Sequence, residues 1–335
     1  MKIQQNISLK KYNTFGIDVI AERFVSISSY FELQQLLQEE KKLFLLSGGS
    51  NMLLTKNIKK LVVHLDIKGI SIDRQTDDFV YLTVNAGENW HEFVLWCIHQ
   101  NYGGLENLSL IPGNVGTCPI QNIGAYGVEV KDTITKVEAL EIVNNKKLTF
   151  SNKECCFGYR NSVFKNKLKG KVIITSVSFK LTTKNHKLQT SYGAIERALQ
   201  ESKTFTPTIK AISNAVITIR KKKLPDPNEI GNSGSFFKNP VVSKLVFKTL
   251  QKKYLKMPFY AVEDQYKIPA GWLIEKAGFK GKRFGNAGVH KNQALVLVNH
   301  GNASGIEVYN LAKKIQQKIL EKYAITLEIE VNIVH

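Results

Sequence analysis

The chain has 335 residues, of which 43% are hydrophobic, 10% aromatic and 22% charged, a composition typical of a soluble globular protein with two or three domains. This apolar content excludes a mainly disordered chain, and no apolar run is long enough for a transmembrane helix or a secretory leader. The formal net charge of +19 favours anionic partners, although the lysines are spread along the chain as on an ordinary solvated surface.

The first half of the chain predicts alternating strands and helices. Ser29 can cap a helix that runs to Lys41, with Leu33, Leu36 and Leu37 on its apolar face. Apolar runs and period-two alternation predict strands at 42–46, 58–67, 79–86, 134–143 and 171–181. Residues 89–100 predict a second amphipathic helix.

The composition of the chain changes near residue 183, and a topological break is expected near residue 223. Helices are predicted from Thr206 to about residue 222, over 242–254, and after a capping box formed by Ser304 and Glu307. The alternation from Ile325 to Ile333 predicts one long terminal strand.

The four cysteines carry no signal for a metal or a disulfide framework. Cys97, Cys118, Cys155 and Cys156 lack C-x-x-C spacing, and the only close pair is vicinal. We therefore expect reduced thiols that serve mainly in packing, and no metal site.

A short glycine-rich loop follows the strand predicted at 42–46. In Ser47-Gly48-Gly49-Ser50-Asn51, two adjacent glycines permit positive φ angles, so that successive backbone N–H groups can converge on an anion. The loop matches neither G-x-G-x-x-G nor a Walker motif. Taken alone, it is equally well explained as a tight turn without a ligand.

A longer glycine-rich loop, Leu110–Gly127, carries a stronger signal. Four glycines alternate with small, amide and hydroxyl residues, so the backbone can approach a flat ligand closely. Irregular loops of this length are usually functional or disordered, and the apolar residues in this one argue against disorder.

Further motifs follow these loops in a fixed order. They are GYRNSVF at Gly158–Phe164, KLPDP at Lys223–Pro227, GSFFKNP at Gly234–Pro240, GWLIE at Gly271–Glu275, GVHKNQAL at Gly288–Leu295, and the terminal Glu330. The two loops together look like the flavin-binding fold of vanillyl-alcohol-oxidase-type enzymes. The whole string, from about Tyr12 to the C-terminus, resembles the UDP-N-acetylenolpyruvoylglucosamine reductase family.

The resemblance implies an α+β fold in three parts. A two-part FAD-binding fold of the vanillyl-alcohol-oxidase (PCMH) type would comprise residues 1–70 with 321–335 and residues 71–222. A C-terminal α+β substrate-binding domain would comprise residues 223–320. The last strand would return to the first part.

The resemblance also implies an oxidoreductase of peptidoglycan precursor synthesis. NADPH would reduce bound FAD, and hydride would then pass to the enolpyruvyl group of a UDP-sugar to give UDP-N-acetylmuramate. Arg160 would hold the substrate carboxylate with two hydrogen bonds, and Glu330 would help to polarise it. Ser235 would protonate the adjacent carbon, with Gly234 freeing the backbone and its neighbours excluding water. Outside this context the three residues would be an ordinary surface arginine, strand glutamate and turn serine.

The remaining site residues fall into two groups. Cofactor contacts are expected from Ser47, Gly48, Gly49, Ser50, Asn51, Pro112, Gly113, Gly116, Gln121, Asn122, Gly124 and Ala125. Substrate contacts are expected from Tyr126, Tyr192, Arg220, Lys223, Asn239 and Gln293. Ser191-Tyr192-Gly193 matches a family subtype in which a tyrosine loop folds over the substrate. We expect a cytoplasmic monomer that neither enters a membrane nor binds nucleic acid.

Two positions depart from related patterns. Asn332 stands where the family usually has arginine, which puts in doubt an ion pair that would anchor the last strand. Ser50 stands where oxidases with covalent flavin often have histidine, so the FAD should be dissociable.

Two other functions compete with this interpretation. An oxidase of small alcohols on the same flavin fold would leave the motifs at 223–227 and 234–240 unexplained. A basic nucleic-acid-binding protein would need clustered charge with stacking aromatic side chains, whereas the lysines here are diffuse.

Overall fold

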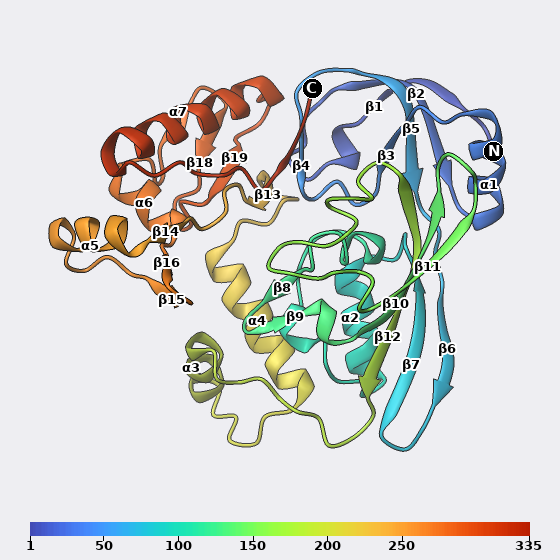
Figure 1. Cartoon of the computed structure of the whole chain (residues 1–335), viewed down its shortest axis with the longest axis horizontal. Helices are drawn as coiled ribbons and strands as arrows, with labels where there is room; N and C mark the ends of the chain where they lie inside the picture. The colour runs from blue at the N-terminus through green and yellow to red at the C-terminus, as the bar shows by residue number, and fades with distance from the viewer. The chain divides into compact units, whose positions relative to one another are not determined.

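The computed structural model describes all 335 residues and divides into two compact units (Figure 1). The first unit comprises Met1–Ile7, Ala21–Gly48 and Lys59–Lys222, and the second comprises Ser8–Ile20, Gly49–Ile58 and Lys223–His335. One boundary falls at the topological break expected near residue 223. The division into three parts with the bounds given above stays a prediction.

The first sheet of the first unit has the strand order β1-β2-β5-β3. Its strands are β1 (Gln4–Ser8), β2 (Ile20–Ile27), β5 (Ile58–Leu65) and β3 (Leu43–Leu46), and helix α1 (Tyr30–Glu39) packs on it through its buried leucines. The Ser29 hydroxyl accepts a hydrogen bond from the Glu32 amide, which confirms the predicted cap. The helix ends two residues before Lys41, because Glu40 is already extended and leads into β3.

The second sheet of the first unit is antiparallel, in the order β11-β10-β12-β7-β6. Its strands are β6 (Ile70–Gln75), β7 (Phe79–Asn85), β10 (Ile134–Glu141), β11 (Lys147–Ser151) and β12 (Val172–Thr182), and helix α2 (Trp90–His99) lies beside it (Figure 1). Val80, Leu82 and Val84 are fully buried, as the alternation predicts. Phe93 of α2 lies 5.1 Å from Phe179 of β12, ring centroid to ring centroid, so the helix and the sheet share one core.

The rest of the first unit consists of the long loop and two helices. The loop contains the 3₁₀ turns η2 (Glu106–Leu108) and η3 (Val115–Thr117), followed by β8 (Gly124–Ala125), β9 (Val128–Glu129) and η4 (Val130–Asp132). Helix α4 (Ile209–Lys223) confirms the predicted helix but begins three residues after Thr206. It packs through Ile212 and Val216 against helix α3 (Gly193–Glu201), which the sequence analysis missed.

The second unit has a four-stranded sheet in the order β13-β19-β18-β17. Its strands are β13 (Gly231–Ser235), β17 (Arg283–Phe284), β18 (Ala287–Val289) and β19 (Val296–Asn299), with helix α7 (Gly305–Tyr323) alongside (Figure 1). The capping box of Ser304 and Glu307 is present, and the predicted apolar face of α7 is buried.

A small helix-and-strand layer completes this unit. It contains β14 (Val241–Ser243), α5 (Lys244–Lys253), β15 (Tyr260–Val262), β16 (Gln265–Lys267) and α6 (Ala270–Lys276). Its core is aromatic, because the Phe247 ring stacks on the Tyr266 ring at 3.9 Å between centroids. No helix of the chain combines the length and the apolar run that crossing a membrane would take.

The C-terminal segment differs from its prediction in extent. Only β20 (Asn332–Val334) is a regular strand, although Ile325, Leu327 and Val331 are buried alternately as expected. β20 pairs in parallel with β4 (Met52–Leu54), so the last strand does return to the N-terminal part of the sequence. The Asn332 side chain donates to the Asn51 carbonyl at 2.8 Å and thereby anchors the strand without an ion pair.

Candidate active site

Close backbone packing explains the glycines of the Ser47–Asn51 loop. A Cβ atom on Gly48 would lie 2.7 Å from Asn114 Oδ1 and 2.8 Å from the Gly113 Cα. Gly49 has a φ of 57°, and a Cβ there would lie 2.1 Å from the Tyr12 carbonyl oxygen. Both positions therefore require glycine on steric grounds.

The first part of the Leu110–Gly127 loop is fixed against the first residue of α2 and the segment before it. The Trp90 amide donates to the Gly113 carbonyl at 3.0 Å, and the Gly116 amide donates to the Ala86 carbonyl at 3.0 Å. A Cβ on Gly116 would lie 2.5 Å from the Ala86 Cβ. Ser47 and Gly48, which belong to the first unit, are thus packed tightly against the second glycine-rich loop through the contact of Gly48 with Gly113.

Among the residues of the two glycine-rich loops, Ser47 is the strongest indication of a bound ligand. Its hydroxyl is buried and has no hydrogen-bond partner, which is costly unless something else supplies one. An unpartnered hydroxyl beside a glycine-lined backbone fits the polar and phosphate groups of a dinucleotide such as FAD. The residues present therefore fit the expected cofactor.

The Asn122 side chain is hydrogen-bonded within the protein at both its nitrogen and its oxygen. Its Nδ2 donates to Glu129 Oε2 at 3.0 Å and to the Gly158 carbonyl at 3.1 Å, and its Oδ1 accepts from the Lys131 amide at 3.1 Å. The amide is fully buried and engaged at both ends. A cofactor contact from Asn122 stays a prediction, and it would have to come from the backbone.

Arg160 lies on a tight turn next to the second loop. Gly158 and Asn161 exchange two backbone hydrogen bonds, and Arg160 between them has a left-handed φ of 51°. The guanidinium donates to the Gly124 carbonyl at 2.6 Å and contacts the Asn122 carbonyl at 3.4 Å. Arg160 is therefore held at the loop that is expected to carry FAD, rather than lying loose on the surface.

A backbone irregularity turns Ser235 away from the core. The pairing of β13 with β19 shifts register between Asn232 and Ser235, and Gly234 has a φ of 67°. Ser233 is buried, whereas Ser235 is exposed. The Phe236 ring packs into the core against Phe15, 6.2 Å away between centroids, so the exclusion of water around Ser235 by its neighbours stays a prediction.

Glu330 lies on the backbone segment next to Ser235. The Glu330 amide donates to the Phe236 carbonyl at 2.9 Å, and Phe237 forms a β-bridge with Ile329. The second unit thus brings two of the three proposed catalytic residues onto adjacent segments. Arg160 belongs to the first unit, so its meeting with the other two stays a prediction.

Three of the predicted substrate residues form a cluster in the first unit. The Tyr126 and Tyr192 rings meet edge to face at 5.3 Å between centroids, and Arg220 is hydrogen-bonded to Tyr126. Burial raises the pKa of Tyr126, with a smaller contribution from Tyr192, while Arg220 opposes the shift. Asn107 connects the cluster by donating to the carbonyls of Tyr126 and Gln189.

His91 is a polar member of this region that the sequence analysis missed. Its Nδ1 accepts from the Leu110 amide at 3.0 Å, and the Leu110 carbonyl accepts from Arg220 Nε at 3.1 Å. A histidine on the polar side of a predicted helix is usually solvated, and its partner here is a backbone amide. No sequence motif could have revealed that contact.

The predicted substrate residues of the second unit lie near the start of α6. Asn239 Oδ1 accepts from the Ala270 amide at 2.9 Å. A Cβ on Gly271 would lie 3.1 Å from Gln293 Oε1, so both amide side chains lie at this turn. Lys223, the last residue of α4, is exposed.

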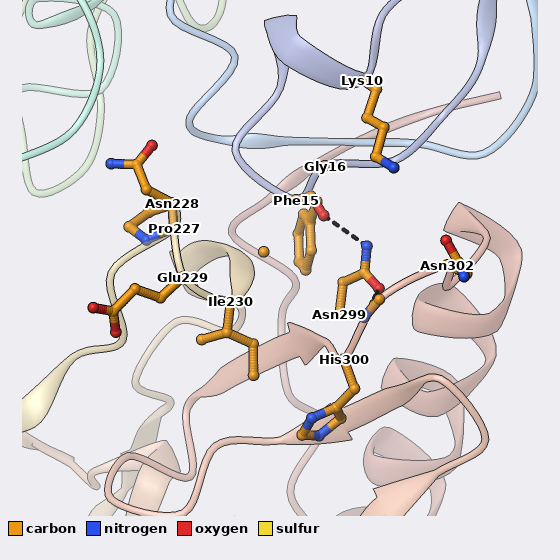
Figure 2. A pocket seen from close by; sticks show the side chains of 12 residues that line it. Lys10, Phe15, Gly16, Pro227, Asn228, Glu229, Ile230, Asn299, His300 and Asn302 are labelled. Carbon is orange, nitrogen blue, oxygen red and sulfur yellow. Dashed lines mark hydrogen bonds between the residues drawn. The ribbon is translucent and has the colours of Figure 1, made fainter.

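The second unit also has a groove of about 340 Å³ that none of the predicted site residues lines (Figure 2). Lys10, Glu229 and His300 contribute its charged or titratable side chains. Asn299 and Phe15 both line the groove, and the Asn299 side-chain amide donates to the Phe15 carbonyl at 2.9 Å. No cluster of three His, Cys, Asp or Glu side chains in the chain could hold a metal ion, and all four cysteines are free thiols.

Comparison with known proteins agrees with this arrangement. A model described as the C-terminal domain of UDP-N-acetylenolpyruvoylglucosamine reductase matches residues 226–334, and a model of an FAD binding domain matches residues 25–146. These two matches confirm the expected fold class of an FAD-binding fold with a C-terminal reductase domain.

Relatives over the full length bear the same name. The chain is 58% identical to UDP-N-acetylenolpyruvoylglucosamine reductase of Flavobacterium johnsoniae and 47% identical to that of Amoebophilus asiaticus, with 100% of both chains covered in each case. The crystal structure of the reductase from Thermus caldophilus shares the fold, with a TM-score of 0.70 at 23% identity over 100% of both chains. The chain belongs to the UDP-N-acetylenolpyruvoylglucosamine reductase family.

Proposed function

We propose that this chain catalyses the NADPH-dependent reduction of UDP-N-acetylenolpyruvoylglucosamine to UDP-N-acetylmuramate, with dissociable FAD as its cofactor. The observation that carries this function is the 58% identity over the whole chain to a reductase of that name. The two glycine-rich loops and the Ser47 hydroxyl would hold FAD, which would supply the hydride-transfer chemistry between NADPH and the methylene carbon of the enolpyruvyl group.

Arg160 and Glu330 act on the substrate carboxylate. Hydride addition to the methylene carbon moves negative charge toward that carboxylate, so a positive and hydrogen-bonding group lowers the barrier. The planar guanidinium of Arg160 can offer two parallel hydrogen bonds, and its fixed turn holds it in place. Glu330 helps to polarise the same group from the segment that pairs with Phe236.

Ser235 supplies the proton for the second carbon. A serine hydroxyl is a weak acid toward water, but it is adequate toward a carbanion-like centre. Ser235 is exposed beside the register shift and the left-handed Gly234, so a substrate can reach it. The product then carries one hydrogen from hydride transfer and one from Ser235.

The substrate diphosphate is bound by Tyr192, Arg220, Lys223, Asn239 and Gln293, with Tyr126 supporting Arg220. We propose that the protein acts as a monomer in the cytoplasm, where NADPH and nucleotide sugars are made. Size-exclusion chromatography of the holoenzyme would test the monomer, and a dimer peak would contradict it.

The reaction is tested by following NADPH absorbance with purified holoenzyme. We expect oxidation of NADPH that depends on the enolpyruvyl substrate and does not occur with UDP-N-acetylglucosamine. Substrate-independent oxidation with formation of hydrogen peroxide would instead indicate an oxidase.

Ser47→Ala tests the cofactor site. Because the Ser47 hydroxyl has no partner in the protein, its removal should leave the stability of the apoprotein unchanged or slightly raised. The affinity for FAD should fall by about two- to tenfold, the worth of one hydrogen bond. Fluorescence titration gives the FAD affinity, and thermal unfolding of the apoprotein gives the stability.

A matched control is Ser178→Ala. The Ser178 hydroxyl lies 2.9 Å from that of Thr83 between two strands, so this change should lower stability and spare FAD affinity. Unchanged FAD binding in Ser47→Ala would exclude a contact between its hydroxyl and the cofactor.

Lys223→Ala tests the diphosphate site. Loss of a charge-assisted hydrogen bond worth about 1.5–3 kcal/mol should raise KM for the UDP substrate about ten- to a hundredfold, with little change in kcat. Tyr192→Phe should raise KM less, because it keeps the ring contact with Tyr126. Lys222→Ala is the control, since Lys222 is also exposed and is paired only with Glu201, at 4.0 Å. A fall in kcat at constant KM would refute the assigned roles.

A further inference from the structure

Leu110 begins the second glycine-rich loop in an unfavourable backbone conformation. Its φ is 58°, in the left-handed region that residues with a Cβ rarely adopt. Its N–H donates to His91 Nδ1 at 3.0 Å, and its carbonyl accepts from Arg220 Nε at 3.1 Å. The two side chains, from α2 and α4, therefore hold the backbone of Leu110 at its N–H and at its carbonyl group.

Further hydrogen bonds connect helix α4 to both ends of the loop. Ser213 lies two turns before Arg220 on α4, and its hydroxyl is 2.8 Å from that of Ser109, with both residues buried. Arg220 is also hydrogen-bonded to Tyr126 near the far end of the loop. Both ends of the loop thus converge on one guanidinium.

The hydrogen bond from Leu110 fixes the protonation state of His91. Nδ1 can accept an N–H only when it carries no proton, so His91 is neutral in this arrangement. Burial lowers the pKa of His91, and Arg220 and Lys221 on α4 add to this effect, while Glu92 on α2 opposes it. Protonation would set two N–H groups against each other and place a positive charge near Arg220.

We propose that His91 is a positioning residue for substrate binding: as a neutral acceptor it fixes Leu110 and, through Leu110, the guanidinium of Arg220. Protonation of His91 then releases Leu110 and weakens the binding of the nucleotide diphosphate. This inference rests on the proposed function, because it takes Arg220 as part of the diphosphate site.

The probe is UDP-N-acetylglucosamine, which has the diphosphate but lacks the enolpyruvyl group. Its phosphates stay ionised over the whole range from about pH 8 to about pH 5, so a change of affinity in this range comes from the protein. Calorimetry with the FAD-loaded protein measures binding without turnover. The flavin spectrum and the melting temperature report whether each variant is loaded and folded.

Three variants separate a positioning role from a structural one. In His91→Asn, the side-chain carbonyl can accept from Leu110 at the place of Nδ1 and does not titrate. His91→Phe keeps a ring of similar size but has no acceptor. His99→Asn is the matched control, because His99 is an exposed histidine at the end of the same helix.

The wild type and His99→Asn should lose affinity about five- to tenfold as the pH falls through the region below about 6.5. His91→Asn should bind as the wild type does near pH 8 and change less than about twofold, and His91→Phe should bind about tenfold more weakly at every pH. The stability that neutral His91 contributes should be complete above about pH 6.5 and be lost below it, in the wild type but not in His91→Asn.

Two results would overturn the proposal. One is a His91→Asn variant that keeps the pH dependence of the wild type, and the other is a His91→Phe variant that is folded and binds like the wild type. If His91→Phe does not fold, the comparison of the wild type with His91→Asn decides alone. A loaded wild type that fails to bind the probe near pH 8 would refute the proposed function, and this inference with it.

Discussion

Replacing Ser235 by alanine should slow the reduction of the enolpyruvyl substrate by about 10²–10⁴, the usual effect of a placed general acid. The NADPH-driven loss of flavin absorbance needs no proton from Ser235 and should keep its rate. Because Ser235 is exposed at the end of β13, the variant should fold and retain FAD. Ser235→Cys should recover part of the loss, since a thiol can also donate a proton.

Stopped-flow absorbance of the flavin follows the two half-reactions separately. Ser233→Ala is the control, because the buried Ser233 hydroxyl bonds to the Met52 carbonyl and should affect stability rather than the proton step. Equal slowing of both half-reactions in Ser235→Ala would indicate structural damage. An unchanged second half-reaction would assign the proton to another donor, with Glu330 on the adjacent hydrogen-bonded segment as the next candidate.

Arg160→Lys should lower kcat by about 10²–10³, although the charge is kept. The guanidinium reaches the carbonyls of Gly124 and Asn122 through two different nitrogens, which orients its plane. A lysine ammonium can replace neither this orientation nor the two-pronged contact with a carboxylate. Glu330→Gln, which removes the charge of the other proposed partner, should also lower kcat.

Steady-state kinetics and FAD content check this expectation together. Arg74→Lys is the matched control, because Arg74 is an exposed residue of β6 that stacks on Tyr81. Near-full activity of Arg160→Lys with normal FAD content would remove Arg160 from the catalytic mechanism, and the same result for Glu330→Gln would remove Glu330.

Local signals predicted the helix caps and the strands with clear alternation, but they did not predict helices α3 and α6 or strands such as β2 and β6. The caps at Ser29 and Ser304 are present, because side-chain capping depends only on residues three positions apart. The alternation of 79–86 was sufficient to predict β7, since one face of that strand is buried. The alternation of 325–333 was misleading, because an extended segment shows the same burial pattern even where few backbone hydrogen bonds form.

Contacts between residues that are far apart in the chain could not be predicted from the sequence. The bulge at Gly234 depends on the pairing with β19, and the contact of Arg160 with Gly124 joins residues 36 apart in the chain. The site residues themselves were recognised by motif, yet their partners were not. Asn122 shows the difference, because nothing in the sequence indicated that its side chain is hydrogen-bonded to the Glu129 carboxylate and to the backbone of Lys131 and Gly158.

Product analysis tests the central claim most directly. Holoenzyme is incubated with NADPH and UDP-N-acetylenolpyruvoylglucosamine, and the nucleotide sugar is examined by mass spectrometry and proton NMR. The account predicts that each NADPH consumed yields one product heavier by two hydrogen atoms, in which a methyl signal replaces the methylene signals. Consumption of NADPH with the enolpyruvyl group unchanged would contradict it.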